Sequence, residues 1–509
     1  MGLPDFSQRE GYAVFERDTL FIGGQWLPSA GSAQLSVQSP STEEIVGIVP
    51  AADTRDVDAA VAAGREAFDE GPWPHLSVDE RASFLVRLLE CLEGRLPEAI
   101  ELQIDEMGGT RAFHTLTMSG VVPFLNRMLF DATFVRHREL REGTAGKVVV
   151  LRQPIGVVGA ITPWNAPVMV AISKLFPSLL MGCPMVLKPA PESPLSAYLL
   201  AEAIEEAEIP HGVVSIVAGG SDIGAYLVSH PDIDQVTFTG SSVGGQSIAA
   251  ACGQLLRPVT LELGGKSAAL VLEGVDMQPH FPQLIGNSLR NSGQICISTN
   301  RILVHQSDHD GFVEQLVEFV AAMKVGDPHD ATTDFGPLAA ARQRDRVEHY
   351  IASGLEEGAK IVLGGGRPAG LEKGWYVEPT IFVNVTNDMR IAREEIFGPV
   401  LSVLSYASED EALAIANDSD YGLGGAVFAA DVDQALRVAS RIETGTCAIN
   451  EAPPSGGGGP FGGLKQSGLG CERGPEGLES FLELKSISLP RGYEPDWSAD
   501  EPEPAVTTP

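Results

Sequence analysis

The chain has 509 residues and a formal net charge of −33, and 44% of its residues are hydrophobic. This length predicts two to four domains with an ordinary globular core. The negative charge disfavours binding to nucleic acid or to anionic membranes, because both depend on basic clusters. No signal-like opening segment and no membrane-spanning apolar run occurs, so we expect a soluble cytoplasmic protein.

The cysteines and histidines give no sign of a disulfide framework or a metal site. The six cysteines include no C-x-x-C pair, which argues against structural disulfides and structural zinc. His305 and His309 have the spacing of helical metal ligands, but the residues around them predict a strand that runs into a turn. We therefore expect solvated loop histidines and no bound metal.

The first 140 residues predict a scaffold. Residues 20–26 are typical of a hairpin that turns on Gly23 and Gly24. Two helices are expected after it, one over residues 53–70 and one from Val78 to about Leu92, because apolar residues recur there at helical spacing.

From Lys147 onward, apolar strands alternate with helices. The expected strands are Val148–Leu151, Ile155–Ile161, Met185–Lys188, Val213–Val217 and Gln235–Thr239, with helices near 168–181, 195–207 and 223–229. Such alternation is typical of a parallel sheet covered on both faces. The pattern predicts a doubly wound, nucleotide-binding α/β domain.

A glycine-rich turn in this domain is a candidate phosphate site. The strand that ends at Thr239 runs into Gly240-Ser-Ser-Val-Gly-Gly245 and a helix, so backbone amides and a helix N-terminus would meet there. A plain tight turn explains the same residues equally well. Lys188 adds a cation at the carboxyl edge of the sheet, where ligands of such sheets bind.

A second alternating region follows and predicts a second α/β domain. Its expected strands are Ile302–His305, Ile361–Leu363, Thr380–Val383, Leu401–Tyr406, Gly425–Ala429 and Cys447–Asn450. The glycine-dense stretch 455–465 is typical of a flexible linker, and we expect the acidic, proline-rich residues 494–509 to be disordered.

The stretch Asn291-Ser-Gly-Gln-Ile-Cys296 places one thiol in a short, glycine-broken loop. A lone cysteine is more often structural than catalytic. Glu262, in Glu-Leu-Gly-Gly-Lys, and Asn165, in Thr-Pro-Trp-Asn, would complete a set of nucleophile, base and amide donor for covalent acyl chemistry.

These motifs, taken in order, resemble the aldehyde dehydrogenase superfamily, of the non-acylating, oxidising kind. The resemblance extends from about Leu20 to Arg491. The motifs that carry it are Thr-Pro-Trp-Asn165, Lys188-Pro-Ala, Phe-Thr-Gly-Ser241, Glu262-Leu-Gly-Gly-Lys, Gly-Gln-Ile-Cys296, Glu394-Glu-Ile-Phe-Gly-Pro399 and Pro460-Phe-Gly-Gly-Leu-Lys-Gln-Ser-Gly468.

The resemblance implies a role for each matching residue. Cys296 would be the nucleophile, Glu262 the base for the deacylating water, and Asn165 an oxyanion donor together with the Cys296 N–H. NAD would be the cofactor, with NADP possible, and its site would be formed by Ile161, Trp164, Lys188, Glu192, Gly220, Gly240, Ser241, Gly245, Glu395 and Phe397.

The resemblance also implies a domain division and an assembly. The cofactor-binding domain would comprise residues 1–137 and 154–263, the catalytic domain 264–479, and a bridging β element 138–153 and 480–493. Family members with this bridging element are commonly dimers or tetramers, so we expect a homodimer or homotetramer.

One position departs from the family pattern. Many NAD-preferring relatives carry an acid three residues after the lysine that matches Lys188, where it binds the adenosine ribose. Here that position is Pro191 and the acid follows as Glu192. The sequence thus leaves open whether Glu192 reaches the ribose.

The resemblance also implies that the helix after Asn165 forms one wall of the aldehyde tunnel. Its residues Ala166, Val170 and Ser173 share one face and are small, whereas Ile295, Ile297 and Phe461 would complete an apolar pocket. We expect bulky or long hydrophobic aldehydes to be preferred over acetaldehyde and charged semialdehydes. The alternatives are a coenzyme A-acylating relative, which needs no Glu262, and a non-catalytic structural protein on the same fold.

Overall fold

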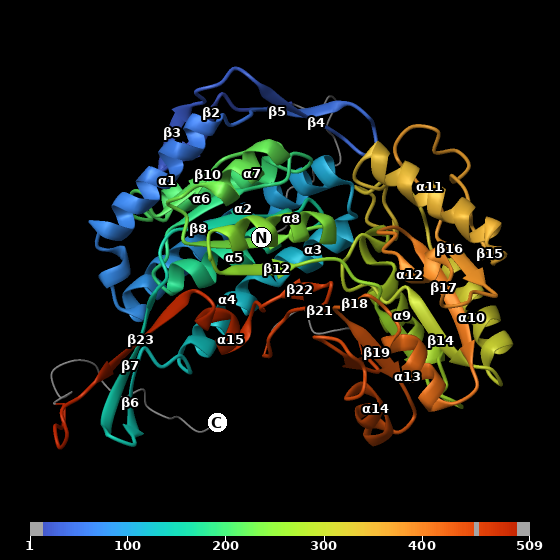
Figure 1. Ribbon diagram of the computed structural model, residues 1–509. Coiled ribbons are helices and arrows are strands. Elements are labelled where there is room, and N and C mark those ends of the chain that lie inside the picture. The colour runs from blue at the N-terminus through green and yellow to red at the C-terminus, as the bar shows by residue number, and fades with distance from the viewer. Residues whose placement is uncertain (1–13, 452–457, 496–509) are drawn as a thin grey trace.

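Two large sheets form the body of the protein, and a small sheet projects from it (Figure 1). The computed structural model describes residues 14–451 and 458–495. Within these residues, no helix combines the length and apolarity needed to cross a membrane.

The first large sheet has eight strands in the order β22-β12-β11-β8-β9-β10-β2-β3. Their bounds are β22 Gly468–Leu469, β12 Val259–Glu262, β11 Gln235–Thr239, β8 Val158–Ile161, β9 Met185–Lys188, β10 Val214–Ile216, β2 Thr19–Ile22 and β3 Gln25–Pro28. The five strands from β12 to β10 are parallel, and β22, β2 and β3 are antiparallel to their neighbours.

Helices cover both faces of this sheet, as the apolar strands predict. One face packs on α2 (Val78–Met107), α4 (Val121–Ala132), α5 (Pro167–Leu180) and α6 (Leu195–Glu206). The other face packs on α1 (Thr54–Asp69), α7 (Ser221–Ser229) and α8 (Ser242–Gln254). α3 (Arg111–Ser119) lies beside α2 and α4.

The second large sheet has seven strands in the order β15-β16-β17-β14-β13-β19-β20. Their bounds are β15 Lys360–Leu363, β16 Thr380–Val383, β17 Val400–Tyr406, β14 Arg301–His305, β13 Ala268–Val271, β19 Gly425–Phe428 and β20 Ala448–Ile449. All pairs are parallel except β15 with β16.

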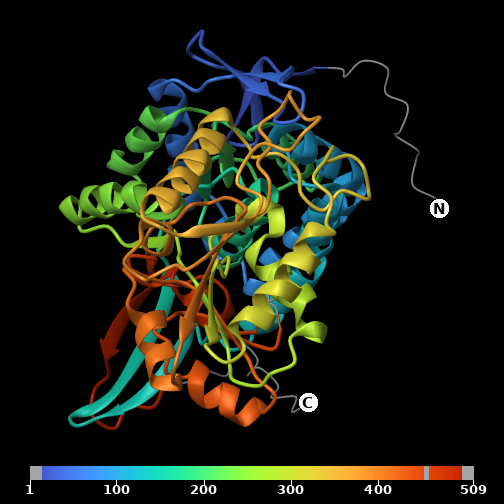
Figure 2. The ribbon, with the colours of Figure 1, turned by 90° about the vertical axis from the view of Figure 1, so that its right-hand side faces the viewer.

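Figure 2 looks onto the side of the molecule that carries this second sheet. One face packs on α9 (Phe281–Ser288) and α10 (His309–Ala321). The other packs on α11 (Ala341–Glu356), α12 (Arg390–Arg393), α13 (Glu409–Asn417) and α14 (Val432–Ala439). Each large sheet therefore has a two-sided core of its own.

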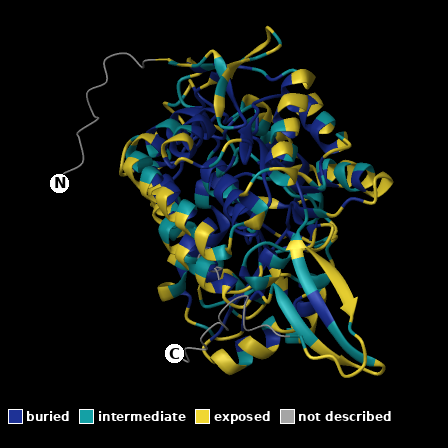
Figure 3. Ribbon diagram, turned by 90° about the vertical axis from the view of Figure 1, so that its left-hand side faces the viewer, coloured by how far each residue is buried: buried dark blue, intermediate teal, exposed yellow. Residues whose placement is uncertain are grey.

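The projecting sheet consists of β6 (Arg138–Gly143), β7 (Gly146–Pro154) and β23 (Leu482–Ser488). β23 pairs with β7 over seven residues, so two segments more than 300 residues apart lie side by side. Figure 3 shows that β23 is largely exposed.

Short elements complete the described chain. They are β1 (Phe15–Glu16), β4 (Gln34–Gln38), β5 (Ile45–Pro50), β18 (Tyr421–Gly422), β21 (Leu464–Lys465), α15 (Gly474–Glu479) and the 3-10 turns η1 (Trp73–His75), η2 (Gln278–His280) and η3 (Arg290–Gly293).

Several sequence predictions need correction. α2 does not end near Leu92 but runs through Pro97 to Met107, where Gly108 stops it in the left-handed region at φ 78°. The pattern missed this extension because buried polar residues such as Glu101 and Glu106 hide the apolar face. Strands β12 and β13 were not predicted, and the strand expected over 155–161 begins only at Val158.

The glycine-dense stretch is not only a linker, because its end forms β21. Residues 452–457 and 496–509 lie outside the described residues, and so does most of the expected disordered tail. His305 ends a strand that runs into a turn, as predicted, whereas His309 begins α10.

Candidate active site

Three adjacent strand ends of the first sheet supply one wall of the site. β11 pairs in parallel with β8 and β12, with Phe238 opposite Ile161 and Thr239 opposite Glu262. Their carboxyl ends therefore meet at one edge, which is where ligands of doubly wound sheets bind. Glu262 ends β12, and Asn165 lies in the turn that follows β8.

The thiol is carried by the loop between η3 and β14, directly after the tightly wound residues of η3. Asn291, Ser292 and Gly293 are consecutive left-handed residues, with φ of 52°, 54° and 73°. A Cβ on Gly293 would lie 2.1 Å from the Gly398 carbonyl oxygen, so only glycine fits there. This winding places Cys296 at the cavity and explains the glycine in the motif.

Side-chain amides tie this loop to the turn after β8. The Asn165 Nδ2 donates to the Gln294 carbonyl oxygen at 2.8 Å, and the Asn291 Nδ2 donates to the Asn165 carbonyl oxygen at 3.2 Å. Gln294 in turn accepts a hydrogen bond from the Ala339 N–H at 3.0 Å. A carboxamide has two N–H groups, so Asn165 keeps a second donor in this arrangement.

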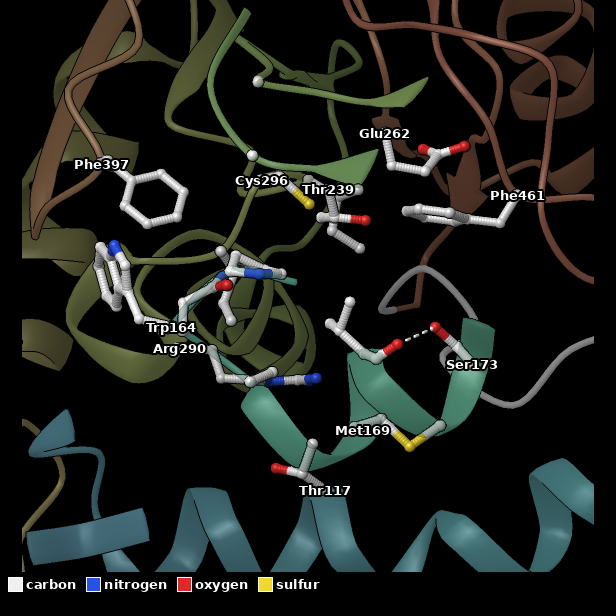
Figure 4. A pocket seen from close by; sticks show the side chains of 18 of the residues that line it. Thr117, Trp164, Met169, Ser173, Thr239, Glu262, Arg290, Cys296, Phe397 and Phe461 are labelled. Atoms are coloured by element: carbon white, nitrogen blue, oxygen red, sulfur yellow. Dashed lines mark hydrogen bonds between the residues drawn. The ribbon is translucent and has the colours of Figure 1, made fainter. Parts of the chain in front are cut away.

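A cavity of about 410 Å³ brings the predicted catalytic residues together. Cys296, Glu262 and Asn165 all line it. In Figure 4, Glu262 and Phe461 lie on one side of Cys296, and Trp164 and Phe397 lie on the other.

Glu262 is the carboxylate whose burial has the clearest chemical consequence. Its side chain is 2% exposed, and neither oxygen has a hydrogen-bond partner among the described residues. Burial raises its pKa well above the ordinary value, and the nearby Glu472 raises it further. A carboxylate in such surroundings is a strong base once it loses its proton.

The thiol of Cys296 is half-buried, and burial raises its pKa to about 12, with Glu395 and Glu262 adding to the effect. Glu395 also lines the cavity, and burial raises its pKa to about 7. The Gly265 N–H donates to Glu395 at 3.0 Å, and an added Cβ on Gly265 would lie 2.5 Å from the Cys296 carbonyl oxygen. The glycines of the Glu-Leu-Gly-Gly-Lys motif thus allow the Glu395 side chain and the Cys296 backbone to approach one backbone segment.

Sequence reasoning missed a third carboxylate at the site. Glu472 lines the cavity and forms an ion pair with Lys174 of α5, whose Nζ also donates to the Thr237 hydroxyl at 2.9 Å. Lys174 is 1% exposed. A lysine inside an otherwise apolar helix was the available signal, because a fully buried ammonium requires a partner.

The predicted cofactor residues fall into two groups, of which the first lines the cavity. Trp164 and Phe397 meet edge to face, with ring centroids 5.4 Å apart. Gly240 and Ser241 lie at the start of α8, where the Ser241 hydroxyl accepts a hydrogen bond from the Gly244 N–H at 3.2 Å.

The second group lies outside the residues that line this cavity. Lys188 is 3% exposed, and its Nζ donates to the carbonyl oxygens of Pro189 at 2.9 Å and Gly219 at 2.7 Å. Glu192 forms an ion pair with Arg342 of α11. The other members are Ile161 at the end of β8, Gly220 at the N-terminus of α7 and Gly245, which packs against Leu263.

All six predicted substrate-pocket residues line the cavity, namely Ala166, Val170, Ser173, Ile295, Ile297 and Phe461. The wall also contains Met169, Thr117 and Arg290, which sequence reasoning did not identify and which lie across the cavity from Cys296 in Figure 4. Arg290 makes no hydrogen bond or ion pair with the described residues. The pocket is therefore less uniformly apolar than expected.

A thiol, a buried carboxylate and an amide donor at the carboxyl edge of a doubly wound sheet are the groups that covalent acyl chemistry requires. The Aldehyde dehydrogenase family matches residues 26–487. The chain is 45% identical to a geranial dehydrogenase of Castellaniella defragrans over 94% of this chain and 99% of that protein. It is 41% identical to a 3-succinoylsemialdehyde-pyridine dehydrogenase of a Pseudomonas species over 93% and 98%.

Solved structures agree. A Mycobacterium tuberculosis aldehyde dehydrogenase in complex with NAD+ has a TM-score of 0.93 and 46% identity, covering 95% of this chain and all of that one. An aldehyde dehydrogenase C mutant of Pseudomonas syringae, in complex with NAD+ and octanal, has a TM-score of 0.89 and 37% identity, covering 92% and 96%. The chain belongs to the aldehyde dehydrogenase family, and the expected fold is confirmed.

Proposed function

We propose that this protein oxidises an aldehyde to the free carboxylic acid with NAD, through a thiohemiacetal and a thioester on Cys296. The observation that carries the proposal is the shared cavity of Cys296, Glu262 and Asn165 in a chain of this family. The NAD+ complexes of similar structures support the choice of cofactor.

The first step is attack of the Cys296 sulfur on the aldehyde carbon, which leaves a negative charge on the former carbonyl oxygen. Because burial raises the pKa of the thiol, its proton must pass to a base, and the Glu262 carboxylate in the same cavity would accept it. The second N–H of the Asn165 amide and the Cys296 backbone N–H would stabilise this oxyanion. Preorganised donors of this kind lower the barrier by about 3 kcal/mol each.

The residues of the cavity also fit a dinucleotide. Bound NAD supplies the hydride acceptor. Phe397 and Glu395 would hold its nicotinamide end, whereas Trp164, Gly240 and the N-terminus of α8 would face its phosphates and adenosine. Lys188, which lies outside the cavity lining, would also contact that part of the cofactor. The fit rests on the small residues of the turn at Gly240–Gly245 and on the backbone N–H groups that the N-terminus of α8 presents to an anion.

Release of the acid requires water to attack the thioester. Glu262 would take the proton of that water, and its raised pKa makes it a suitable base. A coenzyme A-acylating enzyme has no need of this carboxylate, and a purely structural protein needs none of the three residues. These two alternatives are therefore disfavoured.

We further propose that the preferred aldehydes are bulky or long and hydrophobic. Ala166 and Val170 leave room beside the thiol, and Ile295, Ile297 and Phe461 supply apolar surface. Each buried methylene contributes about 0.8 kcal/mol, so transfer to the pocket favours the larger substrate.

The sheet of β6, β7 and β23 is proposed to act as the bridging element of a homodimer or homotetramer. Its support is the exposed β23, which presents Leu484 at 69% exposure. The predicted domain division is proposed as well, with β22 as an exception, because it lies within the range of the catalytic domain and yet pairs with β12 of the first sheet. A cytoplasmic location is part of the same proposal.

Replacement of the nucleophile tests the reaction. The Cys296→Ala variant is expected to lose dehydrogenase activity by more than about 10⁴-fold, because no other group can form the thioester. Binding of NAD, measured by calorimetry, should change by less than about threefold, since the nucleotide contacts lie elsewhere. Turnover comparable to wild type would refute the proposed function.

The substrate preference is tested with a panel of aldehydes. We expect kcat/KM to rise from acetaldehyde to octanal and to aromatic or terpenoid aldehydes. Ala166→Phe should lower kcat/KM for the bulky members by about tenfold or more and spare acetaldehyde. An unchanged ranking would show that this helix face does not form the wall.

A further inference from the structure

The loop that follows Lys188 carries an ion pair across the two large sheets. Glu192 lies between β9 and α6 of the first sheet, and its carboxylate binds the guanidinium of Arg342 in the first turn of α11. α11 packs on the second sheet, and its Gln343 and Arg346 line the Cys296 cavity. The pair is therefore formed where the two halves of the molecule face each other.

The Glu192 side of this pair is held rigidly. The Ser193 hydroxyl donates to the Trp164 carbonyl oxygen at 3.3 Å. The N–H groups of Leu195 and Ser196 donate to the buried carboxylate of Glu106 at 2.7 and 3.2 Å. Glu192 is thus fixed between the cavity wall and the start of α6, and its side chain is only 18% exposed.

The two partners of the ion pair differ in exposure to solvent, and Arg342 is the more exposed of the two. The Arg342 side chain is 60% exposed. Lys188 cannot replace Arg342 as the partner of Glu192, because the Lys188 Nζ is buried and already donates to the carbonyl oxygens of Pro189 and Gly219. Burial lowers the pKa of Lys188 to about 8, and the negative charges of Glu192 and Asp222 oppose this shift. Four charged groups, Lys188, Glu192, Asp222 and Arg342, therefore set the potential at this edge.

We propose that Arg342 is a cofactor-specificity residue: it neutralises Glu192 and presents a guanidinium to the 2′ position of the adenosine ribose, so that the enzyme discriminates only weakly between NAD and NADP. This inference rests on the proposed function, which places the adenosine end of the cofactor beside Lys188.

The chemistry of the pair supports the proposal. A free carboxylate at this position would accept hydrogen bonds from the ribose hydroxyls and repel a 2′-phosphate. An ion-paired carboxylate accepts hydrogen bonds from the ribose hydroxyls less strongly and repels a 2′-phosphate less strongly, because the guanidinium compensates its charge. A guanidinium has five N–H donors in a planar fork, so one that binds a carboxylate can still donate to a phosphate.

Opposite effects are expected from the two single substitutions. Arg342→Gln frees the Glu192 carboxylate, so the ratio of kcat/KM for NAD over NADP should rise by about tenfold. Glu192→Gln leaves the guanidinium unpaired, so the same ratio should fall by about tenfold. The double variant should lie within about threefold of wild type, because both charges are absent.

Binding of nucleotide fragments tests the site without turnover. Calorimetry with ADP and with 2′,5′-ADP, each bound to the full-length protein and to the variants, reports on the adenosine end alone. Arg342→Gln should weaken 2′,5′-ADP selectively, and Glu192→Gln should strengthen it. The exposed pair of Arg367 with Glu348 supplies the control, and Arg367→Gln should leave both fragments unaffected.

The outcomes separate the two proposals. If both substitutions weaken the binding of both cofactors and both fragments equally, the ion pair only stabilises the fold and the specificity role is overturned. Thermal unfolding of each variant shows whether that stabilisation was lost. If neither dinucleotide binds or supports aldehyde oxidation in the wild-type protein, the proposed function itself fails.

Discussion

Glu262 and Glu101 are both buried glutamates near the interface of the two large sheets, yet their surroundings have opposite effects. Glu262 has no hydrogen-bond partner among the described residues, and its pKa is raised. Burial would also raise the pKa of Glu101, but hydrogen bonds from His329 and Arg111 hold it at about 2. A buried carboxylate without hydrogen-bond donors can therefore take up a proton in a reaction, whereas one with such donors stays ionised and stabilises the fold.

The Glu101 cluster joins parts of the chain that are distant in sequence. His329 lies between Glu101 and Asp105 of α2, at 3.3 and 2.9 Å, and the Arg111 Nε donates to the His329 carbonyl oxygen at 3.1 Å. Burial opposes the charge on His329, but the hydrogen bonds with Asp105 and Glu101 raise its pKa to about 9. His329 is therefore a cation at neutral pH.

The largest effect is expected when Glu262 loses its charge. Glu262→Gln should lower steady-state kcat by about 10²–10³-fold, because the amide cannot take the proton of water. Acylation still proceeds, so stopped-flow absorbance should show a burst of reduced cofactor of about one equivalent per site before turnover stalls. Glu101→Gln is the matched control and should give no such burst. Normal steady-state turnover in Glu262→Gln would mean that another group is the base.

The same substitution at Glu101 should act on stability rather than on turnover. Glu101→Gln removes one partner of a largely buried pair and should lower the free energy of unfolding by about 1–3 kcal/mol at pH 7. Denaturant titration measures this loss, and kcat at 25 °C should stay within about threefold of wild type. Loss of activity without loss of stability would contradict a structural role.

The pH dependence of stability should reveal His329. Its pKa is raised above the unfolded value of about 6.5, so its contribution is fully present below that pH and is lost as pH rises through 9. His329→Asn should therefore be less stable than wild type by about 1–2 kcal/mol at pH 6 and by much less at pH 10. A difference that does not vary with pH would show that His329 acts only by packing.

The smallest expected effect is a shift in a pH profile. The negative charge of Glu472 contributes to the raised pKa of Glu262, so Glu472→Gln should lower that pKa. Deacylation requires ionised Glu262, and its rate should then rise at lower pH than in wild type, by about one pH unit or less. Glu476→Gln, a change at a neighbouring exposed carboxylate, is the control. An unmoved profile would mean that Glu472 does not influence the base.

The sequence could predict those site residues whose position is set by a short local motif. Cys296, Glu262 and Asn165 each lie in a short motif whose glycines or proline dictate a turn, and each lines the cavity. Glu472 could not be found in this way, because only the folded chain brings it to the thiol. Arg290 directly precedes the Cys296 motif, but nothing in the local sequence indicates that its side chain lines the cavity. β13 was missed for a related reason, since four apolar residues after a glycine pair give too little periodicity to identify a strand.

The pairing of β22 with β12 has a consequence for the order of synthesis. Leu469 lies opposite Leu261, and Gly468 lies opposite Glu262, so the outer edge of the first sheet is closed by residues from the last tenth of the chain. β23 completes the projecting sheet from the same region. During synthesis, the edge of the first sheet at β12 therefore stays unpaired beside Glu262 until the second sheet has been translated. Glu262 gains its neighbour Gly468 only when almost the whole polypeptide has emerged, and a shorter chain also lacks Phe461 and Glu472 of the cavity wall.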